Sequence, residues 1–378
     1  MRLDRTTLCL VLATTTALYA CDPHDISLGD LPEDDSATDD DGQGVGGQGG
    51  GLGIGGASSE DVVVLAMDGP IEAVRAHGND AYYVKWTPPS SGAASHGIWR
   101  VTTQVTSTEP MPSPELVAEI SVTPNSGYTE IGFDVDATHV YFANNESDGG
   151  PGPSLREIVR FPTSGGAMET LVTEWGLIKS HMVVDSGFVY YVVDGSLKRV
   201  PSDGSGPSTA IGEVGMDHDQ GHVVFALTGS DVVFCEPTGG IYRTPAAGGS
   251  LQLIATAPGP FTGCTGVTLS NDHVFWSTRD ENDFELGYVF SAPLASSGQT
   301  TGELVAAVGT PHALRYHDGA LYYLAGSDAG VLTELDPVTG VETALVPHVS
   351  FYANLAFDAI GPSLVVQQGQ YSLLKVTP

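Results

Sequence analysis

Hydrophobic and polar positions alternate in short runs along most of the chain, and the runs recur in a fixed order. In the first recurring pattern, an aromatic or β-branched run follows a turn rich in Asp, Asn and Gly, which predicts a buried strand entered through a tight turn. The copies are residues 77–83 (HGNDAYY), 136–142 (DATHVYF), 185–191 (DSGFVYY), 230–234 (SDVVF), 271–276 (NDHVFW), 317–323 (HDGALYY) and, more weakly, 361–366 (GPSLVV).

A second pattern follows each aromatic run and combines apolar residues with Arg-x-Pro and a Gly-rich turn. Pro at the end of a strand removes a hydrogen-bond donor where its loss costs little. A short apolar run then ends several units, so each unit predicts an entry strand, an aromatic strand, an Arg-x-Pro strand and an outer edge strand. The clearest Arg-x-Pro copies are residues 158–166 (IVRFPTSGG), 197–204 (LKRVPSDG) and 241–249 (IYRTPAAGG).

The number of units and the two ends of the repeat region predict the fold. The copies recur with a period of about 45 residues, which is typical of a β-propeller blade. The last unit ends at residues 373–378 without a fourth strand, whereas residues 61–66 (DVVVLA) form a strand-like run without a partner. Pairing the two covers an exposed edge. The sequence therefore predicts an all-β, seven-bladed β-propeller of four-stranded blades, with the N-terminal strand closing the last blade, and a pair of β-sandwiches is the alternative.

The repeats also resemble a known group of proteins. Residues 274–278 (VFWST), 140–142 (VYF) and 189–191 (VYY), together with the Arg-x-Pro strands, are similar to the YWTD-type blades of low-density-lipoprotein-receptor proteins and of many secreted bacterial proteins. The resemblance covers nearly all of residues 61–378. It implies an extracellular propeller and is weak for function.

The first sixty residues have a different composition. Residues 1–20 carry Arg2 and Arg5 before an uncharged, mostly apolar run, which is shorter than the about 20 residues of a transmembrane helix and predicts an export signal. The run ends in LYAC, which resembles the bacterial lipoprotein signal with Cys21 as the lipidated residue. We expect an exported, membrane-anchored lipoprotein in the periplasm or on the cell surface, and ordinary secretion remains the alternative.

Residues 21–60 predict a disordered tether behind Cys21. The segment after Cys21 has no Lys or Arg, many acids and a Gly-rich stretch, so it cannot bury enough apolar area to fold. The chain as a whole has 14 Lys and Arg against 46 Asp and Glu, a net charge of −32. This charge excludes nucleic acid as a partner and leaves the lipid anchor as the contact with a membrane. We expect a monomer.

Two cysteines remain once the signal and the lipid site are set aside. Cys235 ends the aromatic strand of one unit, and Cys264 lies at the entry to the next unit. In a propeller these positions lie on one face, so we predict a disulfide in an oxidising compartment. Two unpaired cysteines are the alternative.

The candidate binding residues lie where the entry strands begin, at the predicted channel mouth. Glu130 and Asn354 belong there with several imidazoles that could hold a ligand, bind a metal or act as general bases. If a ligand needs neutral imidazoles, binding weakens below about pH 6. The residues assigned to the mouth are His181, His222, His312, His348 and Tyr352.

Two function classes follow from these residues. The first is a non-enzymatic surface protein that binds a protein or glycan through the channel face. The second is an enzyme, a lyase or a metal-assisted hydrolase, that uses the histidines and distantly resembles the seven-bladed streptogramin lyases. No cofactor is predicted, although the oxygen-rich segment with Asp280, Asp283 and Glu285 is a candidate calcium site.

Overall fold

The described part of the chain is all-β. The computed structural model describes residues 62–67, 69–87, 94–122, 131–144, 155–176, 178–214, 225–236, 239–259, 261–280, 283, 285–296, 298, 300–326, 329–350 and 356–378. Within these ranges the regular elements are strands. The described residues include no helix that is long and apolar enough to cross a membrane. The predicted export signal, Cys21 and the tether lie outside the described residues.

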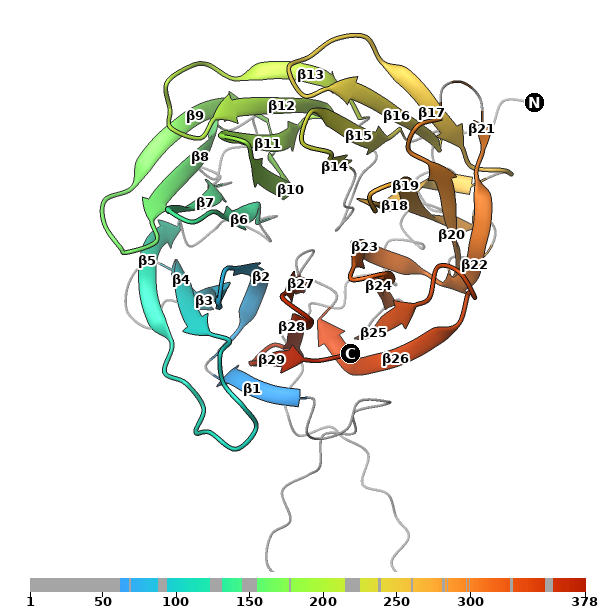
Figure 1. Ribbon diagram of the computed structural model, residues 1–378. Helices are drawn as coiled ribbons and strands as arrows, with labels where there is room; N and C mark the ends of the chain where they lie inside the picture. Colours follow the sequence, from blue (N-terminus) through green and yellow to red (C-terminus); the bar gives the residue numbers. More distant parts are fainter. Residues whose placement is uncertain are drawn as a thin grey trace, which may run out of the picture. The chain divides into compact units, whose positions relative to one another are not determined.

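The strands follow one another as repeated antiparallel groups of four, in the order that the two sequence patterns predict. The first strand of each group lies nearest the common centre around which the groups are arranged (Figure 1), and we call these the inner strands. The inner strands are β2 (Ile71–His77), β6 (Phe133–Val135), β10 (Ile178–Asp185), β14 (Phe225–Leu227), β18 (Phe261–Leu269), β23 (Pro311–His317) and β27 (Phe357–Ile360).

The second and third strands of the groups contain the aromatic and the Arg-x-Pro patterns. The second strands are β3 (Asp80–Thr87), β7 (His139–Asn144), β11 (Phe188–Val193), β15 (Asp231–Cys235), β19 (His273–Asp280), β24 (Ala320–Ala325) and β28 (Ser363–Gln368). The third strands are β4 (Ala94–Thr102), β8 (Leu155–Pro162), β12 (Ser196–Pro201), β16 (Gly240–Pro245), β20 (Leu286–Pro293), β25 (Ala329–Leu335) and β29 (Ser372–Val376).

The outer strands complete the groups, and one of them comes from the other end of the repeat region. They are β5 (Glu115–Val122), β9 (Glu169–Trp175), β13 (Thr209–Glu213), β17 (Gln252–Thr256), β22 (Glu303–Gly309), β26 (Glu342–Ser350) and β1 (Val62–Met67). β1 pairs antiparallel with β29, with Val62 opposite Val376 and Met67 opposite Ser372. This is the pairing that the sequence predicts for the unpartnered run at residues 61–66.

The prediction of a seven-bladed propeller with separate four-stranded blades is wrong. The strands form six separate sheets of four to eight strands. The group β23–β26 and the group of β27, β28, β29 and β1 belong to one sheet, and a parallel bridge joins Val349 to Gly369. Another sheet gains a fifth strand, because β21 (Thr300–Thr301) pairs in parallel with β17. A sequence repeat counts strand patterns and does not record the hydrogen bonds that connect one group to the next.

The hydrophobic core is divided into clusters, and each cluster lies between two neighbouring groups. The cluster that contains Ile98 and Phe142 packs the first group against the second. The cluster that contains Leu65, Tyr83 and Val365 packs the last group against the first. Each group therefore buries both of its faces, which explains why the aromatic strands are almost continuously apolar.

The arginines of the third strands connect neighbouring groups by hydrogen bonds. Arg100, Arg160 and Arg243 lie on third strands, and each donates a hydrogen bond to a carbonyl that follows the third strand of the next group. Lys375 of β29 makes the equivalent bond to Thr103, at 3.0 Å. We call these contacts the outer clips. The acceptors of the three arginines are the carbonyl oxygens of Thr163, Ser202 and Leu294.

Candidate binding site on the inner strands

One residue of each inner strand lies between two apolar neighbours at an equivalent register. Arg75 lies opposite Tyr82, for example, as Asp134 lies opposite Tyr141 in the next group. We call these residues the central positions. In chain order they are Arg75, Asp134, Val183, Ala226, Thr268, Arg315 and Asp358.

Three central positions connect an inner strand to the next one by accepting a backbone hydrogen bond. Asp134 Oδ2 accepts from the N–H of Val184 at 2.6 Å, and Asp358 Oδ2 accepts from the N–H of Ala76 at 2.9 Å. Thr268 Oγ1 accepts from the N–H of Tyr316 at 2.8 Å. These bonds satisfy backbone donors that would otherwise be orphaned between groups.

Four of the central positions are charged, and their signs alternate from group to group. Arg315, Asp358, Arg75 and Asp134 come from β23, β27, β2 and β6, and we call them the charged arc. Arg315 Nη1 lies 3.4 Å from Asp358 Oδ1, and Arg75 Nε lies 3.3 Å from Asp134 Oδ1. The exposed side-chain fractions are 4% for Arg75, 15% for both aspartates and 24% for Arg315, so the pair of Arg75 and Asp134 is the more deeply buried.

Burial dominates the electrostatics of the charged arc. Desolvation raises the pKa of Asp134 to about 6, and the nearby positive charge of Arg75 opposes this rise. Desolvation also lowers the pKa of Arg75, and the positive charge of Arg315 acts in the same direction. The Asp134 carboxyl therefore titrates close to neutral pH.

His181 is the predicted site residue that the structure brings to this region. It lies on β10, is buried, and donates from Nε2 to the carbonyl oxygen of Phe225 at 3.0 Å, so the proton is assigned to Nε2. Its Nδ1 is buried and has no hydrogen-bond partner among the described residues. Burial, with smaller contributions from Arg75 and Arg315, lowers the pKa of His181 to about 3. Both arginines are therefore within electrostatic reach of His181.

The other predicted mouth residues do not form one ring in the described structure. His312 is half-buried on β23, and burial with the charge of Arg279 lowers its pKa to about 4. His348 is exposed near the end of the outer strand β26. The residues that lie outside the described part are Glu130, His222, Tyr352 and Asn354.

The described histidines do not support the pH dependence expected from the sequence. His181 and His312 have pKa values of about 3 and about 4, so both are neutral at pH 6. Titration of these two imidazoles therefore gives no reason for ligand binding to weaken just below pH 6. Asp134, with a pKa of about 6, is a residue of the charged arc whose charge changes near this pH.

The acidic segment predicted as a calcium site is arranged by its own hydrogen bonds. Asp280 Oδ2 accepts from the hydroxyl of Tyr288 at 3.1 Å, and Asp283 Oδ1 accepts from the N–H of Glu285 at 3.0 Å. Across the described residues, no group of three or more His, Cys, Asp or Glu side chains is arranged to hold a metal ion.

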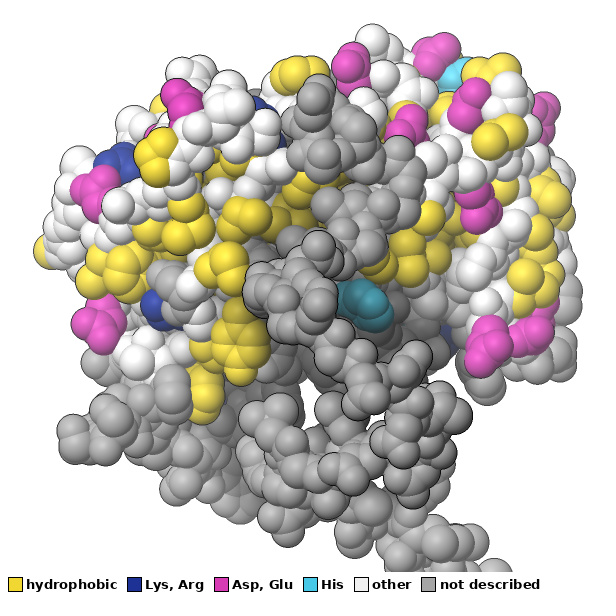
Figure 2. Space-filling view, turned by 90° about the horizontal axis from the view of Figure 1, so that it is seen from below, with side chains coloured by type: hydrophobic (Ala, Val, Ile, Leu, Met, Phe, Trp, Pro, Cys, Tyr) yellow, Lys and Arg dark blue, Asp and Glu magenta, His cyan; other side chains and the backbone are white. Residues whose placement is uncertain are grey.

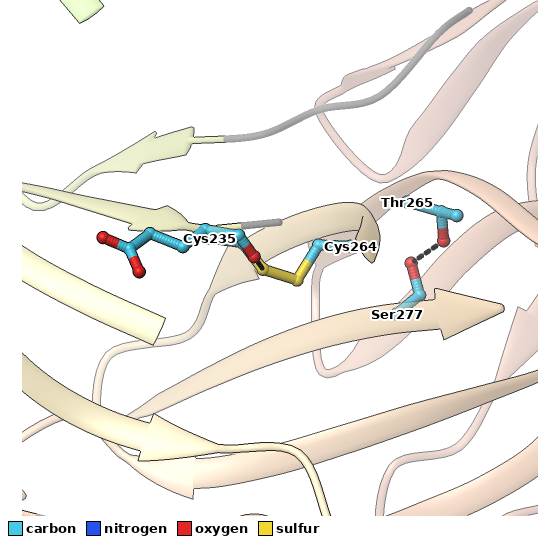
Figure 3. Close-up of a disulfide and its surroundings, with 5 residues drawn as sticks. Cys235, Cys264, Thr265 and Ser277 are labelled. Carbon is cyan, nitrogen blue, oxygen red and sulfur yellow. Dashed lines mark hydrogen bonds between the residues drawn. A yellow bond between two sulfur atoms is a disulfide. The ribbon is translucent and has the colours of Figure 1, made fainter. Parts of the chain in front are cut away.

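The cysteines remaining after the signal and lipid site are joined in the structure. Cys235 at the end of β15 and Cys264 on β18 form a disulfide, with Cα atoms 6.1 Å apart, and it connects two neighbouring groups (Figure 3). Beside it, the hydroxyls of Thr265 and Ser277 are 2.8 Å apart. This is the disulfide that the sequence predicts.

The residues of the charged arc are not among those predicted from the sequence, although the sequence contains a signal for them. Each of these residues lies between two apolar residues just before an aromatic or β-branched run, for example in FDV at 133–135 and LRY at 314–316. Aligning the entry strands as well as the aromatic strands would place Arg75, Asp134, Arg315 and Asp358 at one register position.

Comparison with known proteins adds a structural likeness and no function. No family model matches the sequence, and no curated protein matches it. Among solved structures, the crystal structure of the computationally designed Ika8 protein aligns with a TM-score of 0.50 and 13% sequence identity. The alignment covers 85% of this chain and 100% of the designed chain. At this identity the likeness concerns the fold alone.

Proposed function

We propose that the chain is an exported lipoprotein that binds a protein or glycan, without converting it, at the inner strands. The observation that carries this proposal is a series of contacts that links neighbouring inner strands. Arg315 pairs with Asp358, which accepts from the N–H of Ala76 beside Arg75. Arg75 pairs with Asp134, which accepts from the N–H of Val184 on β10, the strand that carries His181. Residues so far apart in sequence are brought into one region by the arrangement of the groups, as in many ligand sites formed where structural elements meet.

Unused hydrogen-bonding capacity supports a binding role for this region. His181 Nδ1 and Arg315 Nε are buried and have no partner among the described residues. A buried polar atom without a partner costs about 1–3 kcal/mol, and a bound polar group or water removes that cost. The region is therefore prepared for a polar ligand.

The proposal favours binding over catalysis because of the state of the histidines. A general base works best with a pKa near the operating pH, whereas His181 has a pKa of about 3. A neutral imidazole that is difficult to protonate serves well as a hydrogen-bond acceptor.

The proposed location rests on the first twenty-one residues. The LYAC sequence that ends at Cys21 is the basis for lipidation, and the acidic tether would hold the folded part away from the membrane. We expect Cys21→Ser to move the protein from the membrane fraction to the soluble fraction. Intact-mass analysis that shows no acyl chains on the wild type would refute the anchor.

The binding proposal is tested with the full-length protein on a panel of immobilised glycans and secreted-protein domains. The double variant His181→Ala, Arg315→Ala should lose at least tenfold in affinity for whichever panel member binds. The matched control is His348→Ala, which removes an exposed histidine of an outer strand and should bind like the wild type. Equal affinity of the double variant and the wild type would place the site elsewhere, and recovery of a chemically altered ligand would favour the enzyme alternative.

A further inference from the structure

We propose that the inner strands bind the carboxylate of a uronic acid, with the two arginines of the charged arc as donors and His181 as an acceptor for a sugar hydroxyl. This inference rests on the proposed function and specifies the ligand of the same site. The shared chemistry is a single carboxylate beside hydroxyl groups, which is present in a free sugar acid and at the end of a glycan.

The guanidinium groups have more donors than the described residues use. A guanidinium carries five N–H donors. The Arg75 group contacts Asp134 through Nε and donates from Nη1 to its neighbour Val74, at 3.2 Å. The Arg315 group contacts Asp358 through Nη1, and its buried Nε has no partner among the described residues. A carboxylate is the anion whose geometry best matches such donors.

The aspartates of the charged arc, by contrast, are already occupied at both oxygens. Asp134 accepts from Val184 through Oδ2 and faces Arg75 through Oδ1. Asp358 accepts from Ala76 through Oδ2 and faces Arg315 through Oδ1. The arc therefore has donors to spare and its acceptors are used, so an acceptor ligand fits it better than a cation does.

His181 occupies a position at which the other described inner strands have small residues. Two residues before each central position, the fold places Ala or Gly in every other inner strand whose residue there is described. Packing between groups therefore does not require an imidazole at this register. The corresponding residues are Ala73, Gly132, Gly266, Ala313 and Ala356.

The protonation state of this imidazole defines what it recognises. Because Nε2 donates to the carbonyl of Phe225, Nδ1 presents a lone pair, and it has no described partner. A ligand group that donates a hydrogen bond fits this atom. A uronic acid carries such donors, its hydroxyls, on the same ring as the carboxylate. A peptide C-terminus, the competing ligand, carries one amide N–H beside its carboxylate.

The charge of the protein favours a ligand with one carboxylate over a polyanion. The net charge is −32, and Figure 2 shows Asp and Glu side chains spread over the visible face with few Lys or Arg among them. Such a surface repels sulfated or repeatedly charged glycans at long range. A single carboxylate meets less repulsion. Because each arginine of the charged arc already faces an aspartate, the ligand is held by the unused N–H donors and not by a net positive charge.

The test measures binding of sodium D-glucuronate to the full-length protein by calorimetry, with D-glucose as the ligand that has the same ring and no carboxylate. We expect glucuronate to bind at least tenfold more tightly than glucose. A glucuronate-terminated disaccharide and an N-acetylated dipeptide with a free C-terminus distinguish the sources. Tighter binding of the disaccharide assigns the site to glycan ends, and tighter binding of the monosaccharide assigns it to free sugar acids.

Two variants connect that binding to the proposed residues. Arg315→Gln should weaken glucuronate binding at least tenfold, and His181→Ala should weaken it about fivefold while keeping the preference over glucose. The matched control is Arg100→Gln, which changes an arginine of similar side-chain exposure, 28% against 24%, in an outer clip. Melting curves establish that each variant is folded.

The inference is overturned if glucose or the dipeptide binds as well as glucuronate, if no carboxylate ligand binds at 50 mM, or if both site variants bind like the wild type. A neutral glycan whose binding depends on His181 would overturn the uronic acid assignment and leave the proposed function standing. Failure of every panel member and of glucuronate would overturn both.

Discussion

The charged arc and the remaining central positions occupy the same register of the same strand and differ in chemistry. Thr268 connects its inner strand to the next one with an uncharged hydroxyl, in the place where Asp134 and Asp358 use carboxylates. Val183 and Ala226 occupy the position with no side-chain acceptor at all. The repeated group therefore tolerates a hydroxyl or an apolar residue here, and the four charges exceed what the packing of the groups requires.

The largest expected effect comes from converting the charged arc to the chemistry of the other positions. Arg75→Met leaves Asp134 buried without its ion-pair partner, which should lower the free energy of unfolding by about 3–5 kcal/mol. Adding Asp134→Thr installs the residue found at Thr268 and should restore most of that stability, because replacing both members of a buried pair is often neutral. Urea unfolding of the two variants measures both values.

The stability of the double variant decides whether the charged arc is needed for folding. If Arg75→Met with Asp134→Thr is as unstable as Arg75→Met alone, the charged arc is a structural requirement of these groups. The single variant Thr268→Val serves as the control, since it removes one neutral hydrogen bond and should cost about 1 kcal/mol.

The strands and their order could be predicted from the sequence, whereas some of the pairing between strands could not. The strand patterns predicted the strands and their order, and the unpartnered run at residues 61–66 pairs with β29. Hydrophobic periodicity reports which faces are buried, so it succeeds where burial determines the structure. It does not report the bridge between Val349 and Gly369 or the parallel pairing of β21, which depend on contacts between groups.

The candidate site was harder to predict for a related reason. His181 was predicted because it is a histidine near the start of an entry strand, whereas Arg75 and Asp134 each lie between two apolar residues of a short strand. Their importance depends on a partner in another group, 59 residues away for this pair. Pairing across groups follows from the three-dimensional arrangement and is not contained in the local pattern.

The next effect concerns the disulfide, which lies away from the charged arc and connects two groups with apolar or hydroxyl central positions. Changing Cys235 and Cys264 together to Ala should lower the free energy of unfolding by about 3.6 kcal/mol on the chain-entropy model, for a sequence separation of 29 residues. Thermal unfolding with and without a reductant measures this effect. Glucuronate binding should be unchanged, and a loss of binding would show that the two regions are coupled.

A smaller loss of stability is expected at the outer clips, which connect neighbouring groups through their third strands. Arg160 donates from Nη1 to the carbonyl of Ser202 at 2.5 Å and pairs with the exposed Glu169. Arg160→Ala should cost about 2 kcal/mol, mostly from the hydrogen bond to the carbonyl, because exposed ion pairs contribute little. Glu169→Ala should cost less than 1 kcal/mol, and an equal cost for the two variants would contradict this division.

The smallest expected effect is the pH dependence of the charged arc. Arg75, Asp358 and the backbone N–H of Val184 face the Asp134 carboxyl from β2, β27 and β10, and its pKa is about 6 in the folded protein against 3.8 ordinarily. Because the folded pKa is raised, protonation stabilises the folded state. The stabilisation from protonated Asp134 is fully present below pH 3.8 and is lost as the pH rises through about 6. His181, whose pKa is lowered to about 3, acts in the opposite direction as the pH falls below 6.5.

The two contributions are separated by a difference measurement. The unfolding free energy of the wild type minus that of Arg75→Met with Asp134→Thr removes most of the His181 contribution, because burial, the largest cause of its low pKa, is present in both proteins. This difference should move in favour of the wild type by about 1 kcal/mol as the pH falls from 7 to 5, since one pKa unit corresponds to about 1.4 kcal/mol. A difference that stays flat over this interval would mean that the Asp134 carboxylate remains ionised beside Arg75 and that the charged arc keeps its alternating signs throughout.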